Sequence, residues 1–135
     1  MHQLHGIAWL QTLVRNGLAR GALLADDMGL GKTLQVWTFL EWYRQRHPDH
    51  GPALLVVPIG LLDNWEEEYR KFFRGPGHLQ DDRIYRLHGQ GLQSLRRGEG
   101  LDPTRLQEYP VVLTGYATVR DYYQSLGRVR WSVLV

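Results

Sequence analysis

Short apolar runs alternate with segments of helical periodicity along the chain, and this alternation predicts an α/β fold. Residues 53–58 form a continuous apolar run bounded by turn residues, which is typical of a strand covered on both faces. We expect strands at 22–26, 53–58, 83–87, 111–114 and 131–135, and helices at 3–16, 33–46, 61–73, 102–108 and 116–126. Because strands that alternate with helices form βαβ units, the expected sheet is mainly parallel and flanked by helices.

Punctuating residues support several of these boundaries. Gly17 suits the position just past the end of the first helix. Pro48 disfavours helical geometry at the residue before it and so ends the second helix. Asp102 and Pro103 offer an N-cap and a first-turn proline to the helix that follows. The polar, Gly-rich stretch 90–103 is the hardest to assign, with room for a short helix at 91–97.

Composition indicates a single globular domain. The chain has 135 residues, of which 43% are hydrophobic and 22% charged, enough to bury a core. No apolar run approaches the roughly 20 residues that cross a bilayer, and the start of the chain lacks a signal-peptide pattern. The lack of cysteine excludes disulfides and thiolate metal sites. We expect a soluble, intracellular protein with no membrane partner.

The charge is distributed unevenly. Residues 1–67 carry 5 Lys/Arg and 7 Asp/Glu, a net charge of −2. Residues 68–135 carry 11 Lys/Arg and 7 Asp/Glu, a net charge of +4. A basic second half permits a polyanionic partner without requiring one. Arginine supplies 14 of the 16 basic residues, a composition typical of GC-rich bacteria.

The residues most informative about chemistry are 26–33, Asp-Asp-Met-Gly-Leu-Gly-Lys-Thr, between an expected strand and an expected helix. This is the setting of a phosphate-binding P-loop. The glycines allow positive φ and a close approach of the backbone to phosphate, the lysine reaches the β- and γ-phosphates, and the threonine hydroxyl ligates Mg²⁺. The predicted ATP and Mg²⁺ site comprises Asp27, Met28, Gly29, Leu30, Gly31, Lys32 and Thr33, with Lys32 as the catalytic residue.

The two alternatives to this interpretation are a turn that binds no ligand and a dinucleotide-binding fold. A Gly-rich turn that binds nothing does not account for the coincidence of strand, loop, Lys-Thr and helix. A dinucleotide-binding fold would need a third glycine where Leu34 stands. One departure from the general P-loop pattern is Asp26, which occupies the position of the usual first glycine.

Several blocks of sequence, in order, resemble the first RecA-like lobe of the Swi/Snf-related family of superfamily-two helicase-like ATPases. The stretch 3–10 resembles the family's segment before the P-loop, and 24–33 resembles its motif I, including the acidic pair. Residues 55–58 with 61–65 resemble motif Ia, and 112–116 resemble motif Ib. The likeness covers nearly the whole chain, and it departs from the family pattern at His2, Gly60 and Gly115.

This resemblance implies a role for particular residues. Gln3 would recognise adenine, and Pro58, Asn64 and Thr114 would be candidates for contact with the phosphate backbone of double-stranded DNA. For Thr114 the alternative is a structural role, in which the hydroxyl at the end of the strand only caps a turn. Trp65 and Tyr116 are expected to be core or interface aromatics rather than base-stacking groups.

The resemblance also implies an incomplete lobe. The family's next block, Asp-Glu-x-His, does not occur in the sequence, so residues 1–135 are expected to be a partial N-terminal helicase ATP-binding lobe that binds nucleotide without hydrolysing it. The parent would be a DNA-dependent ATPase that translocates on duplex DNA, remodels protein–DNA complexes and uses a second RecA-like lobe; its protein target is unknown. It would be cytoplasmic or nucleoid-associated in bacteria and nuclear in eukaryotes. Another P-loop NTPase or kinase, and a non-catalytic nucleotide-binding interaction module, remain the alternatives.

Overall fold

The computed structural model describes residues 2–17, 31–79 and 83–135. The chain divides into two compact units, residues 1–47 and residues 48–135. The expected first strand at 22–26 and most of the predicted phosphate loop lie outside the described residues.

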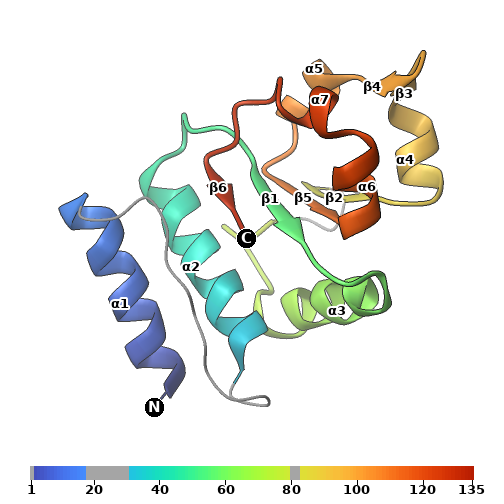
Figure 1. Ribbon diagram of the computed structural model, residues 1–135. Coiled ribbons are helices and arrows are strands. Elements are labelled where there is room, and N and C mark those ends of the chain that lie inside the picture. Colours follow the sequence, from blue (N-terminus) through green and yellow to red (C-terminus); the bar gives the residue numbers. More distant parts are fainter. Residues whose placement is uncertain (1, 18–30, 80–82) are drawn as a thin grey trace. The chain divides into compact units, whose positions relative to one another are not determined.

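The first unit contains two helices, α1 (His2–Asn16) and α2 (Lys32–Arg46), which pack against each other (Figure 1). Gly17 adopts φ 60° and its N–H donates to the Val14 carbonyl at 3.3 Å, so this glycine closes α1 in the left-handed conformation that was expected of it. The His47 N–H donates to the Tyr43 carbonyl at 2.9 Å and ends α2 just before Pro48. Both helices therefore match their expected bounds closely.

The second unit is built on a parallel sheet of four strands, β1 (Ala53–Val56), β2 (Ile84–Leu87), β5 (Val111–Thr114) and β6 (Val133–Leu134). Their order in the sheet is β2-β5-β1-β6, and every pairing is parallel. Each strand coincides with an expected apolar run, although β1 and β6 are shorter than predicted. The parallel α/β architecture predicted from the alternating pattern is confirmed.

One face of this sheet carries the main apolar core of the second unit. Leu54, Leu87 and Val112 point to it and are at most 4% exposed. They pack against residues of the surrounding elements: Leu95, Leu101, Leu106, Leu126 and Val129. Those elements are α4 (Gln90–Leu95), the hairpin β3 (Arg96–Arg97) and β4 (Gly100–Leu101), α5 (Pro103–Gln107), α6 (Tyr116–Asp121) and α7 (Tyr123–Leu126).

The opposite face carries the alternate strand residues. Leu55 and Leu113 are fully buried there, and Arg86 stands beside Leu113 in the strand register. Arg86 hydrogen-bonds to side chains of α3 (Leu62–Phe72), so α3 and the short 3-10 helix η1 (Ile59–Leu61) before it belong to this face. Because both faces are covered, the two central strands β1 and β5 are almost continuously apolar rather than alternating.

Three local details differ from or sharpen the sequence-based prediction. The hairpin β3–β4 was not expected; it turns through Gly98, which has φ 62°. The helix expected at 116–126 is two short helices separated at Tyr122, whose φ of −125° is not helical. As predicted, Asp102 caps α5, since its carboxylate accepts the Thr104 N–H at 3.0 Å and Pro103 occupies the first turn.

Candidate functional site

The beginning of α2 is prepared for an anion by its backbone. Gly31 precedes the helix with φ 77° and ψ 38°, a left-handed conformation that L side chains rarely adopt. The first helical hydrogen bond runs from the Gln35 N–H to the Gly31 carbonyl at 3.0 Å, and among the described residues no side chain caps the helix. The N–H groups of the first turn lie at the positive end of a helix of 15 residues, the end at which an anion is stabilised.

The structure describes only some of the residues expected to complete this site. Lys32 and Thr33 are the first two residues of α2 and are half-buried. Asp27, Met28, Gly29 and Leu30 lie outside the described residues. The donor set present fits a phosphate with an accompanying Mg²⁺: backbone N–H groups at the helix start and an ammonium for the anion, and a hydroxyl oxygen for the cation. Within the described ranges there is no cluster of three His, Asp or Glu side chains that could bind a metal without such an anion.

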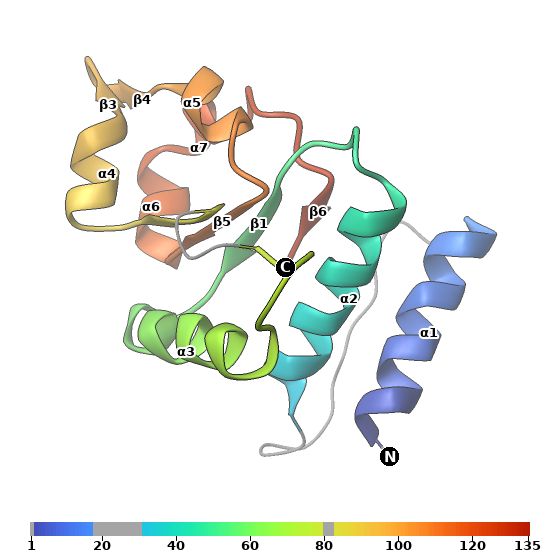
Figure 2. The ribbon, with the colours of Figure 1, turned by 180° about the vertical axis from the view of Figure 1, so that it is seen from behind.

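The start of α1 lies at the same end of the helix pair as the start of α2. Figure 1 and Figure 2 show the two helices side by side and running in the same direction. A side-chain contact near their far ends agrees, since the Arg15 guanidinium carbon lies 5.5 Å from the centre of the Trp42 ring. Gln3, in the first turn of α1, is thereby placed at the end of the pair where Lys32 and Thr33 begin α2.

A second candidate region lies at the carboxyl edge of the sheet, between β1 and β5. These strands are neighbours, but the chain leaves β1 towards α3 on one face and leaves β5 towards α6 and α7 on the other. Such a point of divergence is where open parallel α/β sheets place ligands. Pro58 and Asn64, two of the candidate DNA contacts, are exposed here, in the turn after β1 and in the first turns of α3.

The turns after β1 and β5 also touch each other. A Cβ added to Gly115 would lie 2.7 Å from Cγ1 of Ile59, so the isoleucine occupies the space that a side chain at 115 would need. Around Gly60 the space is open, and no described atom lies within 4 Å of an added Cβ. Ile59 is 48% exposed and Tyr116 is 63% exposed, so this edge carries apolar and aromatic groups on its surface.

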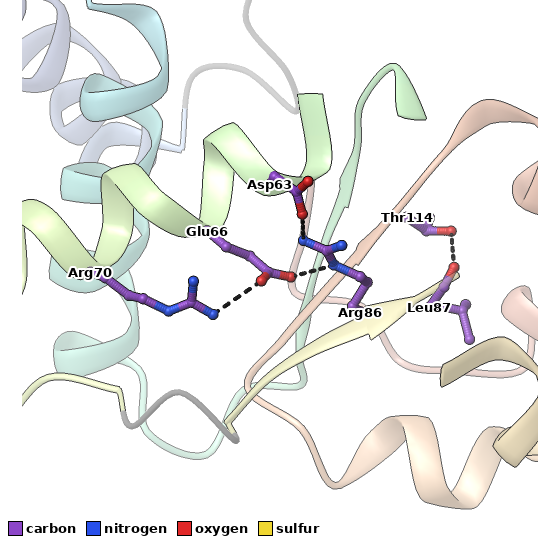
Figure 3. Close-up of polar contacts among 6 residues, drawn as sticks. All are labelled: Asp63, Glu66, Arg70, Arg86, Leu87 and Thr114. Carbon is purple, nitrogen blue, oxygen red and sulfur yellow. Dashed lines mark hydrogen bonds and ion pairs between the residues drawn. The ribbon is translucent and has the colours of Figure 1, made fainter. Parts of the chain in front are cut away.

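Thr114, the third candidate DNA contact, is fully buried. Its hydroxyl donates to the Leu87 carbonyl at 2.8 Å, which joins the ends of β5 and β2 (Figure 3). This geometry favours the structural alternative, in which the hydroxyl only holds the end of the strand. The phosphate contact stays a prediction that would require the hydrogen bond to open.

An ion-pair network fixes α3 to β2. The Arg86 Nε donates to Glu66 at 2.7 Å and its Nη2 donates to Asp63 at 2.6 Å, while Arg70 reaches the other oxygen of Glu66 at 3.2 Å (Figure 3). The hydrogen bonds to Glu66 and then Asp63 raise the pKa of Arg86, and burial opposes them only in part. The network holds the first turns of α3, which carry Asn64, against the sheet edge.

Sequence reasoning did not identify the partners of Arg86 or the contact between Gly115 and Ile59. Asp63 and Glu66 are three residues apart on a helix, and Arg86 sits in an expected strand at a position facing away from the main core, so a pairing could have been suspected. The contact at Gly115 leaves no signal in the sequence, because it depends on which strands become neighbours.

Comparisons with known proteins agree with the fold and the motifs. The family model for the SNF2-related domain matches residues 2–135. The chain is 39% identical to the Zorya protein ZorD of Escherichia coli O139:H28, an alignment that covers 99% of this chain and 14% of ZorD. It is 34% identical to Helicase SWR1 of Debaryomyces hansenii, over 99% of this chain and 8% of that protein.

A solved structure gives the same result. The Sulfolobus solfataricus SWI2/SNF2 ATPase core in complex with dsDNA matches with a TM-score of 0.72 and 32% identity, over 98% of this chain and 24% of that one. The parallel sheet with flanking helices is thus that of part of a RecA-like ATPase core. The chain belongs to the SNF2-related domain family, and it spans only a small part of each of these relatives.

Within the described parts of the chain, no helix combines the length and the apolar character needed to cross a membrane.

Proposed function

We propose that residues 1–135 are part of the N-terminal ATP-binding lobe of a DNA-dependent ATPase that translocates on duplex DNA and remodels protein–DNA complexes. ATP with Mg²⁺ would occupy the start of α2, with phosphates on the backbone of residues 29–33, the Thr33 hydroxyl on the metal and adenine near Gln3. In phosphoryl transfer the metal and the Lys32 ammonium supply charge stabilisation, and the protein's task is to position them.

The observation that carries this proposal is the beginning of α2. Gly31 adopts the left-handed conformation that the motif requires, the helix has no side-chain cap among the described residues, and Lys32 and Thr33 follow at once. An uncapped start of a long helix binds anions through its N–H groups and its dipole. That Gln3 lies at the same end of the helix pair supports one nucleotide reaching both elements.

Nucleotide binding is tested by thermal melts of the chain with and without millimolar ADP. A ligand at a hundredfold excess over its Kd stabilises the folded state by about 2.7 kcal/mol, so we expect a raised melting temperature. Lys32→Ala should remove most of this response. Lys71→Ala, which deletes the same charge from an exposed position on α3, is the matched control and should respond like the wild type. An equal response in all three proteins would show that the start of α2 is not a phosphate site.

Hydrolysis gives a separate test. Because the 135 residues contain no Asp-Glu-x-His, we expect nucleotide to bind without turnover, with or without duplex DNA. In the parent protein Lys32→Ala should abolish ATP hydrolysis. Phosphate release by the purified chain that disappears in Lys32→Ala would contradict the first expectation, and a parent variant with near-normal rates would contradict the second.

A further inference from the structure

We propose that exposed arginines at the edge of the sheet where the strands begin form a docking surface for an acidic segment of another protein. This arginine face is carried by the hairpin β3–β4, by α5 and by the segment 127–130. Its members are all exposed: Arg96, Arg97, Arg105, Arg128 and Arg130. The face belongs to the unit of residues 48–135 alone, and its partner would bind independently of nucleotide.

The arginine face lies opposite to the edge at which β1 and β5 end. The chain runs from α5 into the start of β5 and from the segment 127–130 into the start of β6, and parallel strands begin at one common edge. Two contacts gather these segments there. The Gln107 side chain accepts the Arg130 N–H at 2.9 Å, and the Ser125 hydroxyl accepts the Leu101 N–H at 3.0 Å. Figure 1 and Figure 2 show the hairpin, α5 and α7 together at this end of the sheet.

The guanidinium groups of this face are less engaged than others of the same unit. Among the described residues, the side chains of Arg96, Arg128 and Arg130 form no hydrogen bond or ion pair. Arg97 reaches the Asp102 carboxylate only at 3.7 Å, and its side chain is 78% exposed. Arginines elsewhere in the unit hold carboxylates at 2.6 to 3.2 Å: Arg70, Arg86 and Arg120. An incoming carboxylate therefore finds cations here that it can bind without displacing a described partner.

The hairpin is anchored to the core and to α7. Leu95 and Leu101, at its two ends, are 1% and 4% exposed and belong to the apolar core. A Cβ added to Gly100 would lie 2.6 Å from the Ser125 hydroxyl oxygen, so the hairpin packs directly against α7. Because its backbone is already held in place, little binding energy is lost in ordering it when a partner binds.

The distribution of charge favours an acidic protein segment over a nucleic acid. Residues 95–110 and 125–132 carry five arginines but also three carboxylates, and one of these, Glu99, is exposed in the turn of the hairpin. Consecutive strand residues point to opposite faces, so Arg96 and Arg97 leave the hairpin on different sides rather than in one row. A DNA backbone presents closely spaced like charges, which Glu99 would repel. A polypeptide can instead place carboxylates beside single arginines and a neutral residue beside Glu99.

Arg97 and Arg128 are the pair to test, because they lie on the same side of the hairpin. Arg97 is opposite Gly100 in the register, and directly opposed residues share a face, here the face towards α7. Arg128 follows the end of α7 by two residues, and its N–H donates to the Ser125 carbonyl at 3.2 Å. One acidic segment can therefore reach both guanidinium groups.

The experiment uses a fluorescein-labelled polyglutamate peptide as the probe, titrated with the whole chain at low salt and followed by fluorescence anisotropy. We expect Arg97→Gln with Arg128→Gln to weaken binding about four- to twentyfold, since one exposed ion pair contributes a factor of roughly two to five. The matched control is Arg74→Gln with Arg120→Gln, which removes the same charge from exposed positions outside the face. It should change the affinity by less than about twofold.

Three outcomes would overturn the docking surface. Equal losses in the two double variants would reduce the effect to net charge, and a wild type that does not bind the peptide would show that the face does not take acidic segments. A labelled DNA duplex is titrated in parallel, and Arg97→Gln with Arg128→Gln should cost the duplex no more affinity than the control does. A loss for the duplex that exceeds the loss for the peptide would make the face a nucleic-acid site instead. None of these results bears on nucleotide binding at the start of α2, which the melts with ADP test separately.

Discussion

At the scale of single residues, Gly115 shows that the effect of a substitution can depend on a residue far away in the sequence, here Ile59. The resemblance to the Swi/Snf-related family leads one to expect a threonine or serine here, yet the side chain of Ile59 fills the space beside Gly115. The contact joins the turns that follow the adjacent strands β1 and β5.

We predict that Gly115→Ser destabilises the protein by about 1–2 kcal/mol, because its Cβ would lie 2.7 Å from Ile59 Cγ1 and the isoleucine must move. Ile59 is 48% exposed, so it can partly turn away, which keeps the cost moderate. The measurement is urea denaturation of Gly115→Ser in the wild type and in an Ile59→Ala background. The cost should largely vanish in the second background, and an unchanged cost would mean that the steric explanation is wrong.

At the scale of elements, the hydrophobic pattern located the four strands of the described parallel sheet. Residues 53–56 and 111–113 lie in the middle of the sheet, are covered on both faces and are apolar throughout, so their burial could be predicted from composition alone. The cap at Asp102 could also be predicted, because the Asp102 carboxylate binds an N–H only two residues further along the chain. The hairpin β3–β4 was missed because its strands have two residues each, too few to show any periodicity.

The candidate site was predictable only in part, for a physical reason. Gly31, Lys32 and Thr33 of the proposed phosphate site are consecutive residues at the start of α2, so their pattern is visible in the sequence. The contacts of Trp42 with Arg15 and of Arg86 with Asp63 join residues 27 and 23 positions apart, and no spacing rule predicts which helix faces will meet. The burial of Thr114 likewise follows from its position beside Leu87 in the register.

The link between β2 and α3 gives a prediction at this scale. Arg86 makes charge-assisted hydrogen bonds to two carboxylates, but its side chain is 34% exposed, which reduces their value through solvent screening. We expect Arg86→Lys to cost about 1 kcal/mol, because an ammonium keeps the charge but cannot serve Glu66 and Asp63 with the fork of a guanidinium. Urea denaturation measures this cost.

A matched control for Arg86→Lys is Arg120→Lys. Arg120 is exposed and pairs with its neighbour Asp121 at 3.0 Å within one helix, so it connects no two elements. Its replacement should leave stability nearly unchanged. If both substitutions cost the same, the Arg86 network contributes nothing beyond an ordinary surface ion pair.

At the scale of the whole molecule, the chain carries two candidate binding regions, one in each compact unit. The start of α2 belongs to residues 1–47, and the edge between β1 and β5 belongs to residues 48–135. Family membership indicates that nucleotide and DNA are the ligands to be tested. The two regions also differ chemically, since the first offers backbone N–H groups and the second offers Asn64, Pro58 and exposed apolar side chains.

The last prediction concerns duplex DNA. We expect weak binding that depends strongly on salt, because phosphate contacts release counterions and residues 68–135 carry a net charge of +4. Neutralising even two phosphates makes affinity fall about tenfold between 50 and 200 mM salt. Fluorescence anisotropy with a labelled duplex at both salt concentrations measures the slope. Tight binding that ignores salt would contradict this model, and a preference for one sequence would indicate contacts to base edges instead.

A variant at Asn64 distinguishes, in the same experiment, a neutral hydrogen bond to a phosphate from the effect of charge on DNA binding. Asn64 is exposed in the first turns of α3, where its neutral amide can donate to a phosphate oxygen. Asn64→Ala should therefore weaken binding by a similar factor at both salt concentrations and leave the slope unchanged, because no counterion is exchanged for an amide. Lys71→Gln, about two helical turns further along α3 and also exposed, is the charged comparison and lowers the slope if α3 lies along the DNA. If Asn64→Ala has no effect at either salt concentration, α3 does not contact the duplex, and the edge between β1 and β5 loses its main support as the DNA-binding region.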